Sequence, residues 1–296
     1  MLLPSFSPVS SVLFAVTPYT GNGSTQSIVT GQNLSGGGLV WGKETGATGN
    51  HELGDSIRGA NKQLYPNLTN AENSLASITA YNSNGFSVGT GDGLNANGDS
   101  IVAFSWLEQA GYMDVVTYTG NGSGAGQSVA HNLTVTPSFI ILKNRTNAQE
   151  WPVYHSSLGA GNKIVLNTTA AASASAFFGT QTSSNLVLGS GSGEINAAAN
   201  NYVAYLFAEK AGKSKFGAQS GTTTINTGLP SIKAVLKKRT DSTGDWYLFY
   251  NDGGTWYHVK TNTTDARATG LITVSGGDIT FSGAASTGTG IYAAWG

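Results

Sequence analysis

A hexapeptide, YTGNGS, occurs twice in this chain without a change, at residues 19–24 and at residues 118–123. Six consecutive identities are hard to ascribe to chance, and they indicate a longer internal repeat. Such a repeat constrains the fold more than any local pattern, because each copy must fold into a similar unit. We therefore expect a series of tandem units rather than one continuous domain.

Further matches follow in the same order along the chain. Between the first two copies they pair residues 39–43 with 139–143, 67–69 with 167–169, 86–89 with 186–189 and 101–104 with 202–205. A shorter and more diverged third copy matches residues 235–240 to 141–146, Trp246 to Trp151, 262–264 to 167–169 and 291–295 to 202–206. The sequence thus predicts an N-terminal docking segment at residues 1–17 and units at 18–113, 114–213 and 214–296.

Within a unit, short apolar or alternating runs are separated by clusters of Gly, Asn and Ser. These runs include residues 138–142, 163–166, 186–188 and 202–207. Such a pattern is typical of strands joined by tight turns. Residues 70–75 and 169–176 could form one or two helical turns at most. We predict an all-β fold of tandem β-sandwich-like repeats, lectin-like or jelly-roll-like, arranged like beads along the chain.

The composition narrows the class of protein. Charged residues make up 10% of the chain and hydrophobic residues 39%, while there are 41 Gly. The apolar share is enough to support folded cores. With 15 basic and 16 acidic residues the net charge is −1, so the chain has no basic surface for nucleic acid. A nearly neutral surface favours association instead.

Several kinds of site and segment are absent from the sequence. There is no Cys, which excludes disulfides, thiolate catalysis and Cys-ligated metals. Residues 11–16 are too short an apolar run to span a membrane, and the first residues lack the basic start of a secretory signal. We expect no signal peptide, no membrane insertion and no nucleic-acid partner.

The first unit carries a recognisable series of motifs. They lie, in order, at residues 39–43, 55–60, 67–72, 81–89 and 97–106, and the second unit matches them at 137–145 and 202–207. This series resembles a β-rich repeat domain of virion appendage proteins in marine tailed bacteriophages, which are described as tail-fibre or adhesin-like. The resemblance implies a virion role and a lectin-like sandwich, and it carries no catalytic residues. Gly42 replaces the family's bulky apolar residue, and Gly54 with Asp55 replaces an apolar-Phe-Asp run, so we expect looser packing there.

Candidate catalytic and metal-binding residues give weak patterns. The four histidines, at 51, 131, 155 and 258, do not occupy one equivalent place in all three units. Residues 89–99 alternate oxygen-bearing side chains but lack the leading Asp and the final Glu of a calcium loop. Asp241, Asp245 and Asp252 are the candidate acids for glycan cleavage, with turn positions as the alternative. We predict no catalytic, cofactor-binding or metal-binding residues and no enzymatic activity.

The third unit is the place where we expect a ligand. Its aromatic side chains could stack on sugar rings, and neutral amides and hydroxyls would bind the sugar oxygens. The predicted glycan-binding residues are Trp246, Tyr247, Tyr250, Trp256 and Tyr257. The alternative is that strand alternation places half of them in the core, as the match of Trp246 to Trp151 suggests.

These observations lead to a predicted function. We expect a virion structural protein, assembled in the host cytoplasm and carried on the particle as a tail fibre or adhesive appendage for host attachment. We expect it to form a homotrimer and to contact other tail or capsid proteins and a host surface glycan. The first alternative is a capsid decoration or cement protein, and the second is a glycan-cleaving depolymerase.

Overall fold

The computed structural model describes residues 12–90, 92–190, 192–221 and 224–296. Across these residues the chain is built almost entirely of antiparallel strands, which confirms the predicted all-β, sandwich-like fold. Each unit contains one large sheet and one small sheet. Successive side chains of a strand point to opposite faces of its sheet, and the inner strands of the large sheets are buried on both faces.

The three large sheets share one order of strands. In the first unit the order is β1 (Phe14–Thr20), β7 (Ser100–Leu107), β3 (Gly38–Glu44) and β4 (His51–Asp55). In the second it is β8 (Met113–Thr119), β15 (Asn201–Phe207), β10 (Phe139–Asn144), β11 (Pro152–His155), β12 (Asn162–Val165) and β13 (Ser173–Ala174). In the third it is β16 (Ser214–Ser220), β24 (Thr289–Trp295), β18 (Ala234–Arg239), β19 (Trp246–Asp252), β20 (Thr255–Lys260) and β21 (Ala268–Thr269).

The small sheets complete the sandwiches. In the first unit the small sheet contains β2 (Gln26–Val29), β6 (Gly85–Val88) and β5 (Ile78–Asn82); in the second it contains β9 (Gln127–Ala130) and β14 (Asn185–Leu188); in the third it contains β17 (Ile225–Asn226), β23 (Asp278–Phe281) and β22 (Ile272–Ser275).

The short helices are η1 (Leu34–Gly36), α1 (Asp92–Asn95) and η2 (Gly283–Ser286). Residues 70–75 and 169–176 form no helix. No helix among the described residues is long and apolar enough to cross a membrane.

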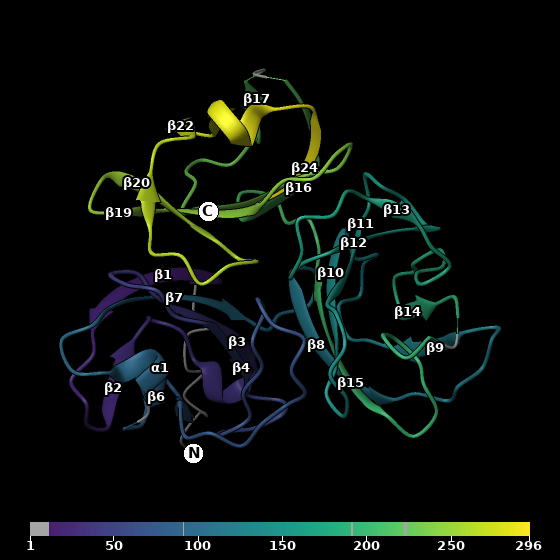
Figure 1. Ribbon diagram of the computed structural model, residues 1–296, viewed down its shortest axis with the longest axis horizontal. Helices are drawn as coiled ribbons and strands as arrows, with labels where there is room; N and C mark the ends of the chain where they lie inside the picture. The colour runs from purple at the N-terminus through teal and green to yellow at the C-terminus, as the bar shows by residue number, and fades with distance from the viewer. Residues whose placement is uncertain (1–11, 91, 191, 222–223) are drawn as a thin grey trace, which may run out of the picture.

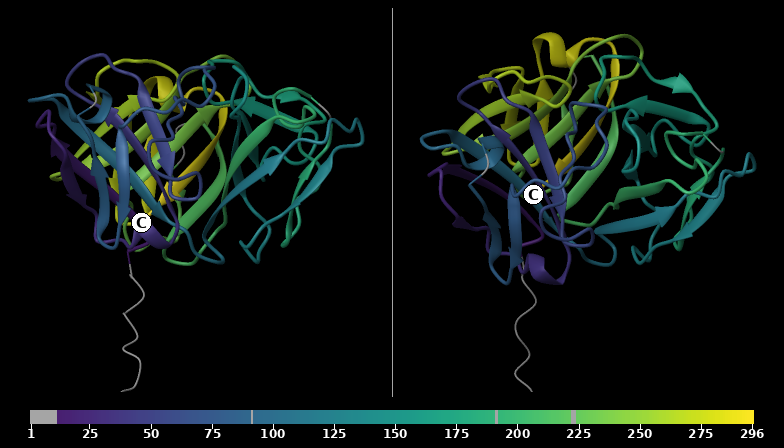
Figure 2. Two further views of the ribbon diagram at one scale, coloured as in Figure 1. Left: turned by 90° about the horizontal axis from the view of Figure 1, so that it is seen from below. Right: turned by 60° about the horizontal axis from the view of Figure 1, so that its bottom comes forward.

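The units close into a ring, so the predicted beaded arrangement was wrong. Figure 1 shows the first unit (purple to blue), the second (teal) and the third (green to yellow) around a common centre, and Figure 2 shows them side by side from two other directions. One backbone hydrogen bond of 2.9 Å occurs at every interface. It runs from the N–H of residue 49, 149 or 244 to the carbonyl of Thr264, Thr69 or Thr169 of the neighbouring unit.

The centre of the ring is an aromatic core shared by all three units. Trp106, Phe207 and Trp295 occupy the same position on β7, β15 and β24. Their rings meet edge to face in a triangle, with centroid distances of 5.8 Å, 5.3 Å and 5.8 Å. Edge-to-face contacts at this spacing are favourable and bury a large apolar area. This shared core is why the units pack together instead of standing apart.

The structure corrects two details of the predicted organisation. Thr17 pairs with Ala103 within β1 and β7, so residues 14–17 belong to the first unit and not to a docking segment. Residues 1–11 of that predicted segment lie outside the described residues. The third copy is shifted by one residue from the expected match: Lys238, not Lys237, pairs as Lys143 does, opposite Ile291 and Val203 respectively.

The expected loose packing at Gly42 was also wrong. The side chain of Leu94, from α1, lies so close that a Cβ on Gly42 would meet it at 2.5 Å. Leu94 is fully buried and fills the space that a bulky residue would occupy. At Gly54 a Cβ would lie 2.7 Å from the hydroxyl of Tyr81. Both glycines are therefore close-packing positions.

The repeated hexapeptide has a structural role. In the first copy the N–H of Asn22 donates to the side chain of Asn95, at 3.0 Å. In the second copy the N–H of Asn121 donates to the side chain of Asn196, also at 3.0 Å. Asn95 and Asn196 are buried. The hexapeptide thus recurs because the same loop is held to a buried amide in both units.

Candidate functional site

One equivalent position contributes a side-chain contact at every interface between units: His51 at the start of β4, Trp151 immediately before β11 and Trp246 at the start of β19. We call the contact between the first and second units the first interface, that between the second and third the second interface, and that between the third and first the third interface. Trp151 donates its indole N–H to the carbonyls of Tyr65 (3.1 Å) and Leu68 (2.9 Å) at the first interface. Trp246 donates to the carbonyl of Val165 at the second, at 2.8 Å.

At the third interface a histidine takes the same position. His51 Nε2 lies 3.0 Å from the carbonyl of Lys260. Burial, together with the charge of Lys43, lowers the pKa of His51 to about 3, although the bond to Lys260 opposes the shift. The imidazole is therefore neutral at ordinary pH and donates this bond as the two indoles do. His51 therefore has an interface role.

Buried lysines cross two of the interfaces. Lys143 donates to the carbonyl of Thr69 at 2.9 Å, and Lys238 donates to the carbonyl of Thr169 at 3.1 Å. Burial lowers the pKa of each ammonium group to about 8. Each lysine binds carbonyl oxygens of the neighbouring unit, so its role is to join the units.

The first interface also holds a cluster of buried charges. Arg58 lies between Asp55 (2.5 Å) and Glu72 (2.8 Å), and its side chain is fully buried. Arg145 of the second unit binds Glu72 through both oxygens, at 2.8 Å and 3.0 Å. Tyr205 donates its hydroxyl to Asp55 at 2.9 Å. Burial alone would raise the pKa of Glu72, but the two guanidinium groups lower it below its ordinary value.

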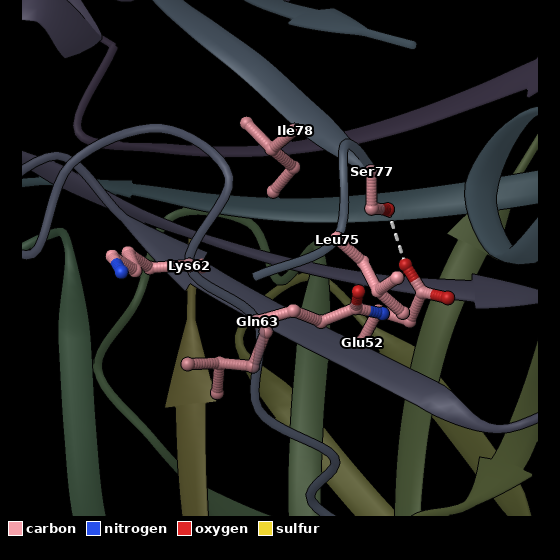
Figure 3. A pocket seen from close by; sticks show the side chains of 8 residues that line it. Glu52, Lys62, Gln63, Leu75, Ser77 and Ile78 are labelled. Carbon is pink, nitrogen blue, oxygen red and sulfur yellow. Dashed lines mark hydrogen bonds between the residues drawn. The ribbon is translucent and has the colours of Figure 1, made fainter. Parts of the chain in front are cut away.

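A small pocket lies between the sheets of the first unit. We call it the Glu52 pocket, and it is lined by Glu52, Lys62, Gln63, Leu75, Ser77 and Ile78, among others. Figure 3 shows the amide of Gln63 and the hydroxyl of Ser77 both close to the carboxyl group of Glu52. Ser77 donates a hydrogen bond to Glu52. The cavity volume is about 10 Å³, which is room for one oxygen atom such as that of a water molecule.

The polar groups of the Glu52 pocket are deeply buried. Glu52 is 6% exposed and Gln63 is 4% exposed. Neither polar atom of the Gln63 side chain makes a hydrogen bond of normal geometry. Burial raises the pKa of Glu52, and the nearby Ser77 hydroxyl and Gln63 amide partly oppose the rise. The backbone at Gly93 covers the carboxyl group so closely that a Cβ there would meet Oε1 at 1.4 Å.

The positions equivalent to Gln63 in the other two units carry different side chains with different partners. The pairs Leu53 with Leu64, Val153 with Ile164 and Leu248 with Val259 establish the register. By that register, Gln63 corresponds to Lys163 and to His258. Lys163 pairs with Glu194 at 3.1 Å, and its ammonium lies 3.9 Å from the ring centroid of Phe177. The Glu52 pocket is therefore particular to the first unit among the described residues.

The five predicted glycan-binding residues do not form one exposed surface. Trp246, Tyr247 and Tyr250 are buried, at 1%, 7% and 0% exposure. Tyr257 stacks against Tyr250 at 5.9 Å, and Arg267 lies 4.1 Å from its ring centroid. Trp256 packs with the third unit's sandwich core, whereas Tyr257 packs with the central core. Alternation along β19 and β20 directs these side chains into two cores, as the alternative interpretation expected for half of them, and glycan binding by the five residues stays a prediction.

The candidate acids for glycan cleavage each have their own cation. Asp241 pairs with Arg239 at 2.6 Å, Asp245 with Lys260 at 3.1 Å and Asp252 with Arg267 at 3.0 Å. The structure thus places these three carboxylates in three separate ion pairs. Among the described residues, no group of three or more His, Asp and Glu side chains is placed to hold a metal ion.

Sequence reasoning missed the Glu52 pocket. The match at an offset of 100 residues places Glu52 opposite Pro152 and Gln63 opposite Lys163, so the two polar residues stand where the second copy differs. That difference was a usable signal. What the sequence could not provide is that both side chains turn inward to one cavity.

The chain is similar to one known protein family. The sequence model of that family, described as a domain of unknown function (DUF7483), matches residues 9–295. The match spans the whole ring, so the three units together correspond to this one domain. The searches of curated proteins and of solved structures found no match.

Proposed function

The chain belongs to the DUF7483 family, and we propose that it is a virion structural protein, carried on a tail fibre or similar appendage and contributing to attachment. The closed ring is the observation that carries this proposal. Three sandwich units share one aromatic core and one repeated set of contacts between units. Such a body holds three similar outer faces in fixed positions, which suits simultaneous attachment to a repetitive surface.

The ionisable groups also support a structural role. His51, Lys143 and Lys238 bind carbonyl oxygens across the interfaces, and the charges around Arg58 bind one another. Catalytic groups are instead expected to face a cleft that could admit a substrate. The resemblance of the sequence to phage appendage repeats gives the setting. The proposal therefore assigns these groups to holding the ring together.

Labelling of intact particles tests the proposed location. Antibodies raised against the purified chain should bind at the tail or its fibres in electron micrographs. Binding over the whole capsid would overturn the appendage role in favour of a decoration protein. Particles without any label would overturn both.

Attachment and assembly need separate measurements. Purified chain added before infection should lower adsorption of the particles to host cells, and release of reducing ends from host polysaccharide would contradict a non-enzymatic role.

The proposed homotrimer predicts a mass in solution three times the 30.4 kDa of one chain. A mass of one chain would show that the intramolecular ring suffices without trimer formation.

A further inference from the structure

The Glu52 pocket has the features of a binding site for a single hydroxyl group. Gln63 is 4% exposed, yet neither the oxygen nor the nitrogen of its amide makes a hydrogen bond of normal geometry, although the amide lies near the carboxyl group of Glu52. Buried polar groups are nearly always paired, because an unpaired one costs about 1–3 kcal/mol. A group that enters the cavity and both donates and accepts would satisfy this amide.

The size of the cavity limits what can enter. Its volume of about 10 Å³ fits one oxygen atom and excludes a whole sugar ring or a carboxylate group. A hydroxyl group is both a donor and an acceptor, as the Gln63 amide requires. It also suits Glu52 and Ser77, which lie beside the amide in Figure 3.

The mouth of the cavity indicates what carries the hydroxyl group. Leu75 lines the cavity and is 50% exposed, so we assign the mouth to this side chain, one of the most exposed large apolar side chains among the described residues. Lys62 lines the cavity too, and its ammonium donates to the hydroxyl of Ser74 at 3.2 Å. Apolar carbon atoms next to a polar cavity match a sugar, whose C–H face is apolar and whose hydroxyls project from its edge.

We propose that the Glu52 pocket binds one hydroxyl group of a neutral sugar, with the sugar ring resting on Leu75. The buried carboxyl group of Glu52 disfavours anionic sugars, and a lone carboxyl group with an amide is a poor cation site. This assignment rests on the proposed attachment function and names its ligand class. It differs from the predicted aromatic site, which lies in another unit.

The test uses the full chain and defined probes. Methyl glycosides of glucose, galactose and mannose are added at millimolar concentration, and the side-chain amide signals of Gln63 are followed by NMR. At least one glycoside should move these signals, and glucuronic acid should not. If none of the three neutral glycosides moves them, the pocket holds only water and the proposal is overturned.

Matched variants separate binding from folding. Gln63→Met keeps the length of the side chain and should weaken binding of the active glycoside about tenfold, the effect of losing roughly 1.4 kcal/mol. Lys163→Met changes the equivalent position of the second unit and should leave binding unchanged. Unchanged affinity in Gln63→Met would overturn the proposal.

A second variant tests the proposal even if Gln63→Met does not fold. Leu75→Ala removes an exposed side chain, so the ring should fold normally, while the glycoside should bind several-fold more weakly. Equal affinity in this variant would contradict a ring resting on Leu75. If the glycoside tests fail, label at the tail would still support the appendage role. If no label is found at the tail, a glycoside that moves the Gln63 signals would still support sugar binding in the Glu52 pocket. The two proposals can therefore fail separately.

Discussion

The first and second interfaces of the ring share their backbone contacts and differ in their side chains. The N–H of Glu72 donates to the carbonyl of Arg145, and the N–H of Ala172 donates to the carbonyl of Thr240, both at 3.0 Å. Yet Glu72 and Arg145 form an ion pair, whereas Ala172 and Thr240 carry no charge. The same backbone geometry therefore forms with and without an ion pair between these two positions.

The third interface supports this reading. There the N–H of Arg267 donates to the carbonyl of Thr45, again at 3.0 Å. Arg267 pairs with Asp252 of its own unit, so its charge is not used across the interface. The contacts common to all three interfaces define the ring. The cluster around Arg58 occurs at the first interface in addition to these common contacts. Removing Arg58 should lower the stability of the chain because it leaves buried charges without a partner, and not because the ring geometry needs the cluster.

The largest expected effect comes from removing one member of that cluster. Arg58→Met should destabilise the chain by about 3–5 kcal/mol, because Asp55 and Glu72 would remain buried with fewer positive partners. Urea unfolding followed by fluorescence measures the loss. Leu158→Met at the equivalent position of the second unit is the control, and this volume-conserving change should cost less than about 1.5 kcal/mol. Equal losses in the two variants would contradict the difference between the interfaces.

Replacing either interface tryptophan should destabilise the chain less than Arg58→Met does, and by the same amount at both interfaces. Trp151→Phe and Trp246→Phe each remove an indole N–H that donates to a carbonyl of the neighbouring unit, Leu68 and Val165 respectively, at a cost of about 1–3 kcal/mol. The two losses should agree within about 1 kcal/mol, since the contact recurs at both interfaces. Thermal and urea unfolding of both variants measure them. A negligible loss for Trp151→Phe alone would show that the charged cluster, not the common contact, holds the first interface.

The sequence predicted the units and their strands because a repeat, and the alternation within it, can be seen in the order of the residues alone. The match of Trp246 to Trp151 correctly indicated a shared buried position. Ring closure was missed, because the contact of the N–H of Gly49 with Thr264 joins residues far apart in the chain. The burial of Tyr250 against another unit was missed for a related reason. Alternation says that neighbouring side chains point apart, but the second core against which Tyr250 packs comes from another unit.

The smallest effect concerns the junctions that connect consecutive units. At the second junction Glu209 pairs with Lys215 at 2.9 Å. At the first junction Glu108 faces Asp114, and burial, followed by this neighbouring carboxyl group, raises the pKa of Glu108 to about 8. The folded chain then binds more protons than the unfolded chain between about pH 4.5 and pH 8, so this group's contribution to stability falls as the pH rises through that range.

Glu108→Gln removes that dependence. The variant should equal the wild type near pH 4 and be more stable by about 1 kcal/mol above pH 8, a value reduced for solvent screening because the side chain is only half-buried. Glu209→Gln is the matched control and should lose at most about 1 kcal/mol, with the opposite sign, because it breaks a surface ion pair. Urea unfolding at pH 4 and pH 9 measures both. A stabilised Glu209→Gln, or a Glu108→Gln variant whose gain in stability over the wild type is no larger at pH 9 than at pH 4, would show that the two junctions do not differ in charge as their sequences indicate.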